Sequence, residues 1–209
     1  MFSLQQLFGK GDKFFDLLEA AAQEAHESVR LTNELIKSPR DTQKLDDLVL
    51  ARRKEKKISD RISEELVQTF VTGLEREDIE ALSRTIYKIP KTAEKLAERF
   101  LLATPHLQGA EFTRQAEMMT RATDVVLMMV RHLRQLDDLE QIKELNDKLQ
   151  YVEGEADKLM NELLRDLYSG KFDALRAIVI RDLDELIEKV VDRCRDVGNV
   201  VMNIVLKNS

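Results

Sequence analysis

Apolar residues recur at spacings of three and four along almost the whole chain, and the breaks in this pattern fall at the few turn-forming residues. Such a periodicity is typical of amphipathic helices, each of which turns one apolar stripe away from water. We therefore expect an all-α protein. The predicted helices span residues 11–37, 41–72, 76–103, 109–136, 138–169 and 173–206.

The predicted breaks carry residues that begin or end helices. The segment 38–41 contains a proline and an aspartate, which suit a turn followed by a helix start. Gly73 suits a helix end and overlaps a Thr72-x-x-Glu capping pattern. Gly170 suits the end of the fifth helix in the same way, and residues 103–109 form the most loop-like stretch, near the middle of the chain.

The two halves of the sequence are related by an internal repeat. Residues 64–73 match residues 161–170 at an offset of 97, and residues 11–14 match the segment 98 residues later. The simplest interpretation is one three-helix unit repeated once, with each unit an antiparallel bundle. We therefore predict two tandem three-helix bundles, at 1–104 and 105–209, that together form one compact domain.

Composition narrows the classes of protein that fit. The net charge of −6 and the pI near 5.3 offer no general attraction to nucleic acid. Cys194 is the single cysteine, which excludes an internal disulfide and a cysteine-based zinc site and fits a reducing compartment. The longest apolar run, 125–130, is far shorter than the roughly 18 residues that cross a bilayer, and the first residues lack the features of a signal peptide. We expect a soluble cytoplasmic protein.

Signatures of enzymes are absent from the sequence. It contains no G-x-S-x-G, no glycine-rich phosphate loop and no G-x-G-x-x-G. His26, His106 and His132 complete neither a Glu-x-x-His pair nor a His-Glu-x-x-His motif, and we expect His26 and His132 on partly exposed helix surfaces. Cys194 lies on an apolar stripe and is predicted to be a buried hydrophobe. We expect a protein without catalytic residues.

Carboxylates four residues apart are the main candidates for binding chemistry. Residues at this spacing share a helix face, so their oxygens can bind one hard cation. The 39 acidic residues would give about seven such pairs by chance, and the chain has nine, but a run of four is rarer. The pairs of interest are Glu153 with Asp157 and the ladder Asp184, Glu188, Asp192 and Asp196. A solvated acidic face is the alternative, and the helical wheel places the last three acids away from the apolar stripe.

Four segments, taken in order, resemble the PhoU-like regulators of phosphate transport, and most closely the accessory proteins of Pit-type inorganic phosphate transporters. These segments are 7–19, 69–79, 152–157 and 186–196, and the resemblance covers essentially the whole chain. It implies a fold of two tandem three-helix bundles. It also implies that Glu-x-x-x-Asp motifs bind iron, zinc or another cation such as manganese or magnesium at the bundle surface. The implied metal ligands are Glu153, Asp157, Glu188, Asp192 and Asp196.

The first half departs from this metal-binding pattern. Through the repeat, Glu153 corresponds to Lys56 and Asp157 to Asp60, while the acids of the last helix correspond to Arg84, Lys88 and Thr92. Residues 1–104 carry 18 basic and 19 acidic residues, a net charge of −1, whereas residues 105–209 carry 15 and 20, a net charge of −5. We therefore expect a metal site on the second bundle only, with Asp60 paired to nearby basic side chains.

A basic cluster at residues 52–57 leaves two interpretations open. It could attract phosphate, an anionic membrane or an acidic partner, but a solvated helix face is favoured because acidic residues are interspersed and follow closely.

The resemblance predicts a non-enzymatic regulator or accessory protein of inorganic phosphate transport. Such a protein would bind a phosphate transporter or its sensor on the cytoplasmic side and touch the membrane only through that partner. The alternative is a metal-binding or metal-storage bundle without a transporter partner, whereas a metal-dependent phosphatase has little support because no nucleophile or base can be named. The sequence leaves open whether the protein is a homo-oligomer.

Overall fold

Six long helices make up the protein in a computed structural model, which describes residues 4–38 and 43–209, with side chains from Lys13 onward. Within this part of the chain there is no strand, so the predicted all-α class is confirmed. A 3-10 turn, η1, at Thr104–His106 follows the third helix. The helices are α1 (Leu4–Lys37), α2 (Gln43–Gln68), α3 (Arg76–Ala103), α4 (Thr113–His132), α5 (Leu139–Leu167) and α6 (Ala174–Asn208).

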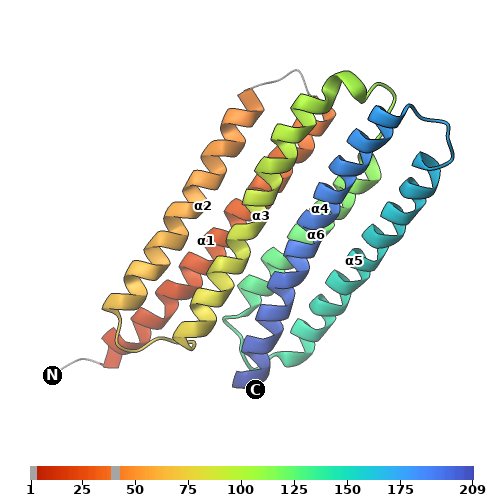
Figure 1. Ribbon diagram of the computed structural model, residues 1–209. Helices are drawn as coiled ribbons and strands as arrows, with labels where there is room; N and C mark the ends of the chain where they lie inside the picture. Colours follow the sequence, from red (N-terminus) through yellow and green to blue (C-terminus); the bar gives the residue numbers. More distant parts are fainter. Residues whose placement is uncertain (1–3, 39–42) are drawn as a thin grey trace.

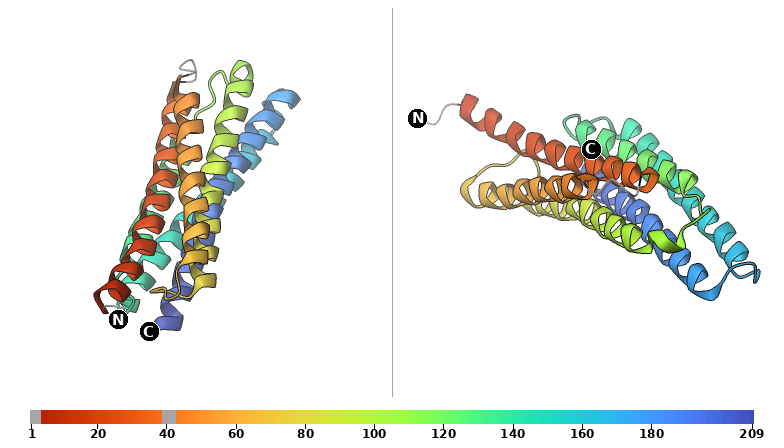
Figure 2. Two further views of the ribbon diagram at one scale, coloured as in Figure 1. Left: turned by 90° about the vertical axis from the view of Figure 1, so that its left-hand side faces the viewer. Right: turned by 90° about the horizontal axis from the view of Figure 1, so that it is seen from above.

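The helices form two antiparallel three-helix bundles, as the repeat predicted. Helices α1, α2 and α3 pack on one another, and so do α4, α5 and α6. The bundles lie side by side, with α3 against α6 and α1 against α4, while α2 and α5 lie at the outer edges (Figures 1 and 2). Because buried residues of all six helices belong to one continuous hydrophobic cluster, the two repeats share a core.

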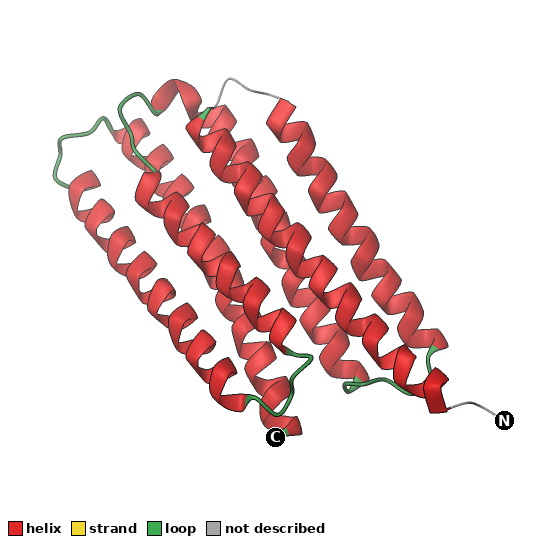
Figure 3. Ribbon diagram, turned by 180° about the vertical axis from the view of Figure 1, so that it is seen from behind, coloured by secondary structure: helices red, strands yellow, loops and turns green. Residues whose placement is uncertain are grey.

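The connections lie at the two ends of the molecule. The loops α2–α3 and α4–α5 and the end of α6 lie at one end, and the connections α3–α4 and α5–α6 lie at the other (Figure 3). Gly109 and Gly170 adopt positive φ angles of 75° and 81°, which glycine tolerates without a steric penalty. The expected helix-ending role of Gly170 and the loop at the middle of the chain are thus confirmed, whereas residues 39–41 of the first predicted break lie outside the described residues.

The end of α2 was predicted wrongly. The helix stops at Gln68, four residues before Thr72, because the Arg76 guanidinium donates hydrogen bonds to the carbonyl oxygens of Leu66 and Thr69. These bonds satisfy acceptors that a longer helix would have paired internally. The predicted capping box is also wrong, since the Thr72 hydroxyl donates to the carbonyl of Leu74 at 2.6 Å instead of capping α3.

Aspartate side chains cap the N-termini of α5 and α6. The carboxylate of Asp138 accepts a hydrogen bond from the Gln141 amide at 3.2 Å, and that of Asp173 accepts one from the Arg176 amide at 3.0 Å. Such caps satisfy amides that have no partner within the helix. Of the helices that the structure describes, none combines the length and the apolar character that crossing a bilayer requires.

Candidate functional site

The five carboxylates implicated by the sequence lie along the seam between α5 and α6. We call this set the acidic ridge. Asp157 is exposed, and the other four side chains are partly buried. The ridge consists of Glu153 and Asp157 on α5 and Glu188, Asp192 and Asp196 on α6.

Close packing of α6 on α5 places the two rows of acids near each other. On α6 the apolar stripe that includes Val190, Cys194 and Val197 is fully buried, which turns the acids to the flank of the helix. Gly198 permits the close approach, because a Cβ at this position would lie 2.6 Å from Cδ2 of the buried Leu149 on α5. The geometry of the ridge therefore depends on core contacts of the same helix pair.

The acids of the ridge interact across the seam. Burial, together with the charges of Asp192 and Asp157, raises the pKa of Glu188 to about 7. The pKa of Asp192 is raised by burial and by Asp157, and that of Glu153 is raised by burial in spite of Arg195. Partial desolvation and like charge both disfavour the ionised forms, so a bound cation would relieve an unfavourable arrangement.

Arginines neutralise two members of the ridge, Glu153 and Asp196. The Arg195 guanidinium lies 3.3 Å from a carboxylate oxygen of Glu153 and also donates to the side-chain oxygen of Asn146 at 2.7 Å. Arg193 donates to Asp196 at 2.8 Å. Asp157, Glu188 and Asp192 form no ion pair with another described side chain, so their carboxylates are the ones left to bind a cation.

The side chains of the ridge do not form a finished metal site. Among the described residues, no three histidine, cysteine, aspartate or glutamate side chains converge on one point where a metal ion could lie. The donors fit a hard cation in their chemistry, since all are carboxylate oxygens, but side-chain rotation is required for them to share one ion. In the described part of the chain, the ridge thus presents carboxylate oxygens at the protein surface without bringing three of these side chains to one point.

Repulsion between the carboxylates of the ridge should lower the stability of the metal-free protein. Replacing Asp192 with asparagine is expected to raise the free energy of unfolding at pH 8 by about 0.5 kcal/mol, since a like charge near Glu188 and Asp157 is lost from a largely solvated surface. The gain should shrink at pH 5, where Glu188 is protonated. Urea unfolding of the metal-free protein measures it. Asp147→Asn, on an exposed part of α5, should show no such pH dependence, and a destabilised Asp192→Asn would contradict the prediction.

Asp184, the first acid of the ladder on α6, does not belong to the acidic ridge. Asp184 is only 2% exposed, and one of its carboxylate oxygens has no hydrogen-bond partner among the described residues. Burial raises its pKa to about 6, against the effect of a hydrogen bond from Gln115 on α4. Each step of four residues turns the helix by about 40°, so twelve residues carry the ladder about 120° around α6. Asp184 is therefore turned away from the ridge, in line with the helical wheel, which placed only the last three acids of the ladder opposite the apolar stripe.

The corresponding surface of the first bundle is basic, as expected from the repeat. The Lys56 ammonium lies 2.5 Å from the Asp60 carboxylate, so the predicted pairing of Asp60 is confirmed. Lys56 also lies 5.7 Å from the ring centroid of Tyr87. These contacts give Lys56 a structural role on an exposed helix face.

The sequence interpretation missed Glu55. We placed it on a solvated face, but its side chain is fully buried and neither carboxylate oxygen has a hydrogen-bond partner among the described residues. Burial raises its pKa to about 8. The signal was present in the spacing, because Glu55 follows Leu48 and Ala51 on the buried face of α2.

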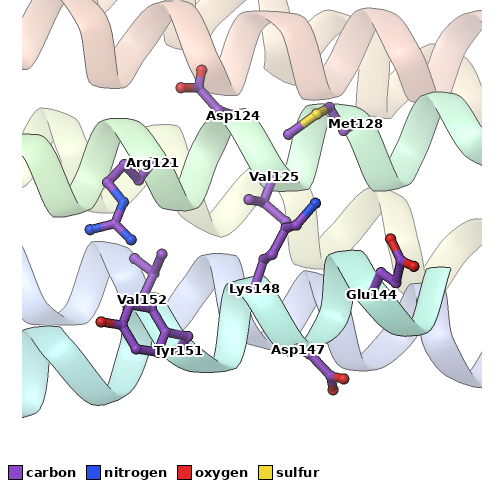
Figure 4. Close-up of a pocket in the computed structure, with 9 residues that line it drawn as sticks. All are labelled: Arg121, Asp124, Val125, Met128, Glu144, Asp147, Lys148, Tyr151 and Val152. Carbon is purple, nitrogen blue, oxygen red and sulfur yellow. The ribbon is translucent and has the colours of Figure 1, made fainter. Parts of the chain in front are cut away.

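A surface groove with a volume of about 610 Å³ lies between α4 and α5 (Figure 4). Acidic and basic side chains alternate with Val125, Met128 and Tyr151, and Arg121 lies over the Tyr151 ring at 6.0 Å. The described residues that line it include no serine, threonine, cysteine or histidine. It lies on the side of α5 away from the acidic ridge.

The two helix histidines and the cysteine have structural surroundings. A ring nitrogen of His26 lies 2.7 Å from Asp124, which links α1 to α4, and one of His132 lies 2.9 Å from the cap residue Asp138. Both histidines are partly exposed, as predicted. Cys194 is fully buried, which confirms its expected position, and burial raises the pKa of its thiol.

Comparison with known sequences gives relatives over most or all of the chain. No protein-family model matches the sequence. A Rhizobium meliloti protein named "Putative pit accessory protein" is 23% identical over 217 residues, and the match covers 98% of this chain and 97% of that protein. The UPF0111 protein YkaA of Bacillus subtilis is 23% identical over 145 residues, which cover 69% of this chain and 70% of YkaA.

Comparison with solved structures gives the same fold. A PhoU-like protein from Shewanella oneidensis superposes with a TM-score of 0.80 at 15% identity, over 93% of this chain and 99% of that chain. A second PhoU-like protein of that organism superposes with a TM-score of 0.76 at 17% identity, with the same coverage. The fold is that of PhoU-like proteins, and the resemblance of the chain to PhoU-like proteins and Pit accessory proteins is confirmed.

Proposed function

We propose that this protein is a non-enzymatic regulator or accessory protein of inorganic phosphate transport. It acts by binding a phosphate transporter or its sensor on the cytoplasmic side of the membrane. The observation that carries the proposal is the match to a Pit accessory protein along nearly the whole of both chains. The PhoU-like fold supports it, because long charged helices offer broad surfaces for a partner.

Phosphate uptake tests the proposal. Cells that lack the protein should take up radiolabelled phosphate at an altered initial rate, and the wild-type chain should restore the original rate. A chain with Glu188→Gln and Asp192→Asn should restore it as well if the protein acts mainly through its partner. Unchanged uptake in the deletion strain at low and at high external phosphate would refute the proposed role.

The acidic ridge is part of the proposal as a cation site, for Fe(III), Zn(II), Mn(II) or Mg(II). Asp157, Glu188 and Asp192 would supply the oxygens, since arginines neutralise Glu153 and Asp196. A bound cation would offset the burial and the like charge that raise the pKa values of Glu188 and Asp192. It would supply charge neutralisation and rigidity at the seam between α5 and α6.

Titration of the metal-free protein with each ion tests the cation site. Calorimetry should give at least a tenfold weaker affinity for the Glu188→Gln, Asp192→Asn variant than for the wild type, although the loss of repulsion makes the metal-free variant more stable. A matched pair, Glu162→Gln with Asp166→Asn, removes two exposed acids of α5 outside the ridge and should bind like the wild type. Equal affinities for all three chains would exclude the ridge as the site.

A metal-binding or metal-storage bundle is the second candidate function, and the mutual repulsion of the ridge acids is the observation that favours it. The two candidates differ in one result. If metal is the primary ligand, the ridge variant fails to restore the phenotype of the deletion strain, whereas a regulator that acts through its partner restores it.

A further inference from the structure

A second groove with strongly basic walls is lined by residues of α2, α3 and α6. Helices α3 and α6 pack side by side there (Figure 1). The volume of the groove is about 500 Å³. Six cationic side chains line this basic groove, against two carboxylates, Glu94 and Glu98. The cations are Arg52 from α2, Lys88, Lys91 and Lys95 from α3, and Lys189 and Arg193 from α6.

Much of this positive charge is uncompensated. Arg52 pairs with Glu94, and Arg193 pairs with Asp196 of the acidic ridge. None of the four lysines forms an ion pair with another described side chain, and Glu98 is the remaining carboxylate of the lining. The six cations and the three nearby acids, Glu94, Glu98 and Asp196, together give a local charge of about +3. The net charge of the whole protein is −6. The groove is therefore a local attractor for anions.

The groove includes part of the first bundle's counterpart of the acidic ridge. Lys88 on α3 corresponds through the repeat to Asp192 on α6, and the seam between α2 and α3 corresponds to the seam between α5 and α6. This position thus carries an acid in the second bundle and a lysine in the first, and the counterpart of Asp196, which is Thr92, also lines the groove. A surface that would attract cations in the second bundle attracts anions in the first.

The cations form two rows, which suits an elongated ligand. On α3 the lysines at 88, 91 and 95 follow one face and span about 10 Å along the helix. Across the groove, Lys189 and Arg193 lie one turn apart on α6. A single tetrahedral anion is too small to contact the whole length, whereas an anion with several linked charged centres can contact both rows.

The size and lining of the groove favour a small inorganic ligand. Its volume is in the range of small-molecule sites, and Leu186 is the one apolar side chain among the described residues that line it, which leaves a peptide without the apolar anchors that docking sites offer. Its described lining has no aromatic side chain on which a nucleobase could stack. Lysine ammonium groups bind phosphoryl oxygens as mobile point charges.

We propose that the basic groove binds a linear inorganic oligophosphate, an anion of at least three linked phosphoryl groups, between the lysines of α3 and the cations of α6. This inference goes beyond the proposed function and does not rest on it, since it requires no transporter. The groove would give the protein a direct response to condensed phosphate.

Calorimetric titration of the full chain with sodium tripolyphosphate, in 150 mM NaCl with a chelator, tests the proposal. Tripolyphosphate should bind at least tenfold more tightly than orthophosphate or sulfate, and its affinity should fall as salt increases. The variant Lys91→Gln, Lys95→Gln should lose at least tenfold in affinity. The control variant Lys158→Gln, Lys171→Gln removes the same charge from two exposed lysines outside the groove and should stay within twofold of the wild type.

Four results would overturn the proposal. An equal loss in the groove and control variants would mean that only net charge matters, and no binding of tripolyphosphate at this salt concentration would leave the groove without its ligand. Tighter binding of ATP than of tripolyphosphate would identify a nucleotide instead. Equally tight binding of an oligoglutamate peptide would identify an acidic protein segment. A thermal melt of each variant confirms that the fold is intact, and none of these results depends on phosphate uptake.

Discussion

Replacing Glu55 with leucine is expected to stabilise the protein by about 3–5 kcal/mol at pH 8, and by little at pH 5. The side chain is fully buried in the first bundle, and neither oxygen has a hydrogen-bond partner among the described residues. Burial raises the pKa of this carboxyl from its ordinary 4.5 to about 8. A neutral, apolar side chain removes the cost of ionising a buried acid.

The sign of the pH dependence follows from proton binding. Because the pKa of Glu55 is higher in the folded state, the folded protein binds more protons than the unfolded chain between pH 4.5 and 8. The free energy of unfolding therefore falls as the pH rises through this range and then levels off. In the leucine variant this part of the pH dependence should disappear.

Leucine should fit at this position, because the equivalent residue of the second repeat is Val152, which is 2% exposed. Urea unfolding of both chains at several pH values between 5 and 9 measures the difference. Glu64→Gln, an exposed position of the same helix, serves as the control and should stay within about 0.5 kcal/mol of the wild type. A leucine variant that is less stable than the wild type at pH 8, or a difference that is the same at every pH, would contradict the prediction.

Replacing Phe100 with alanine is expected to lower the free energy of unfolding by about 3–5 kcal/mol. Phe100 lies near the end of α3, is 3% exposed and packs edge to face on Phe112, with the ring centroids 5.4 Å apart at an angle of 74°. Phe112 directly precedes α4 and is also buried. The aromatic pair thus fixes the connection between the two bundles, and alanine would leave a cavity there.

Leu102→Ala is the matched control, because this side chain lies two residues away on the same helix and is 77% exposed. It should change the free energy of unfolding by no more than about 0.5 kcal/mol in urea unfolding. A double-mutant cycle with Phe112→Ala should give a coupling energy of about 0.5–1.5 kcal/mol. The assigned role of the pair is wrong if Phe100→Ala costs no more than the control.

The architecture could be predicted from the sequence because apolar periodicity is a local signal. Six helices and their pairing into two repeats follow from spacing and self-similarity. The prediction of helix ends was less accurate where contacts with a side chain distant in the sequence determine the end. The early end of α2 depends on Arg76, which binds carbonyl oxygens up to ten residues earlier in the chain, and no capping rule contains that contact.

The residues of the acidic ridge could be predicted from the sequence, but the electrostatic interactions between them could not. The spacing of Glu188 and Asp192 indicates a shared helix face, but their raised pKa values depend also on Asp157 across the seam. The pairing of Arg195 with Glu153 requires the close contact of two helices that Gly198 allows. Helix packing decides these contacts, and it also brings cations of three helices together in the basic groove.

The most direct test of the proposed role is native affinity capture of the tagged full-length chain from detergent-solubilised cells grown at low and at high phosphate. An inorganic phosphate transporter, or the sensor associated with it, should be recovered with the wild-type chain in at least one condition, and should be absent from a capture with the tag alone. Recovery of neither protein at either phosphate concentration would contradict a role as a regulator of phosphate transport.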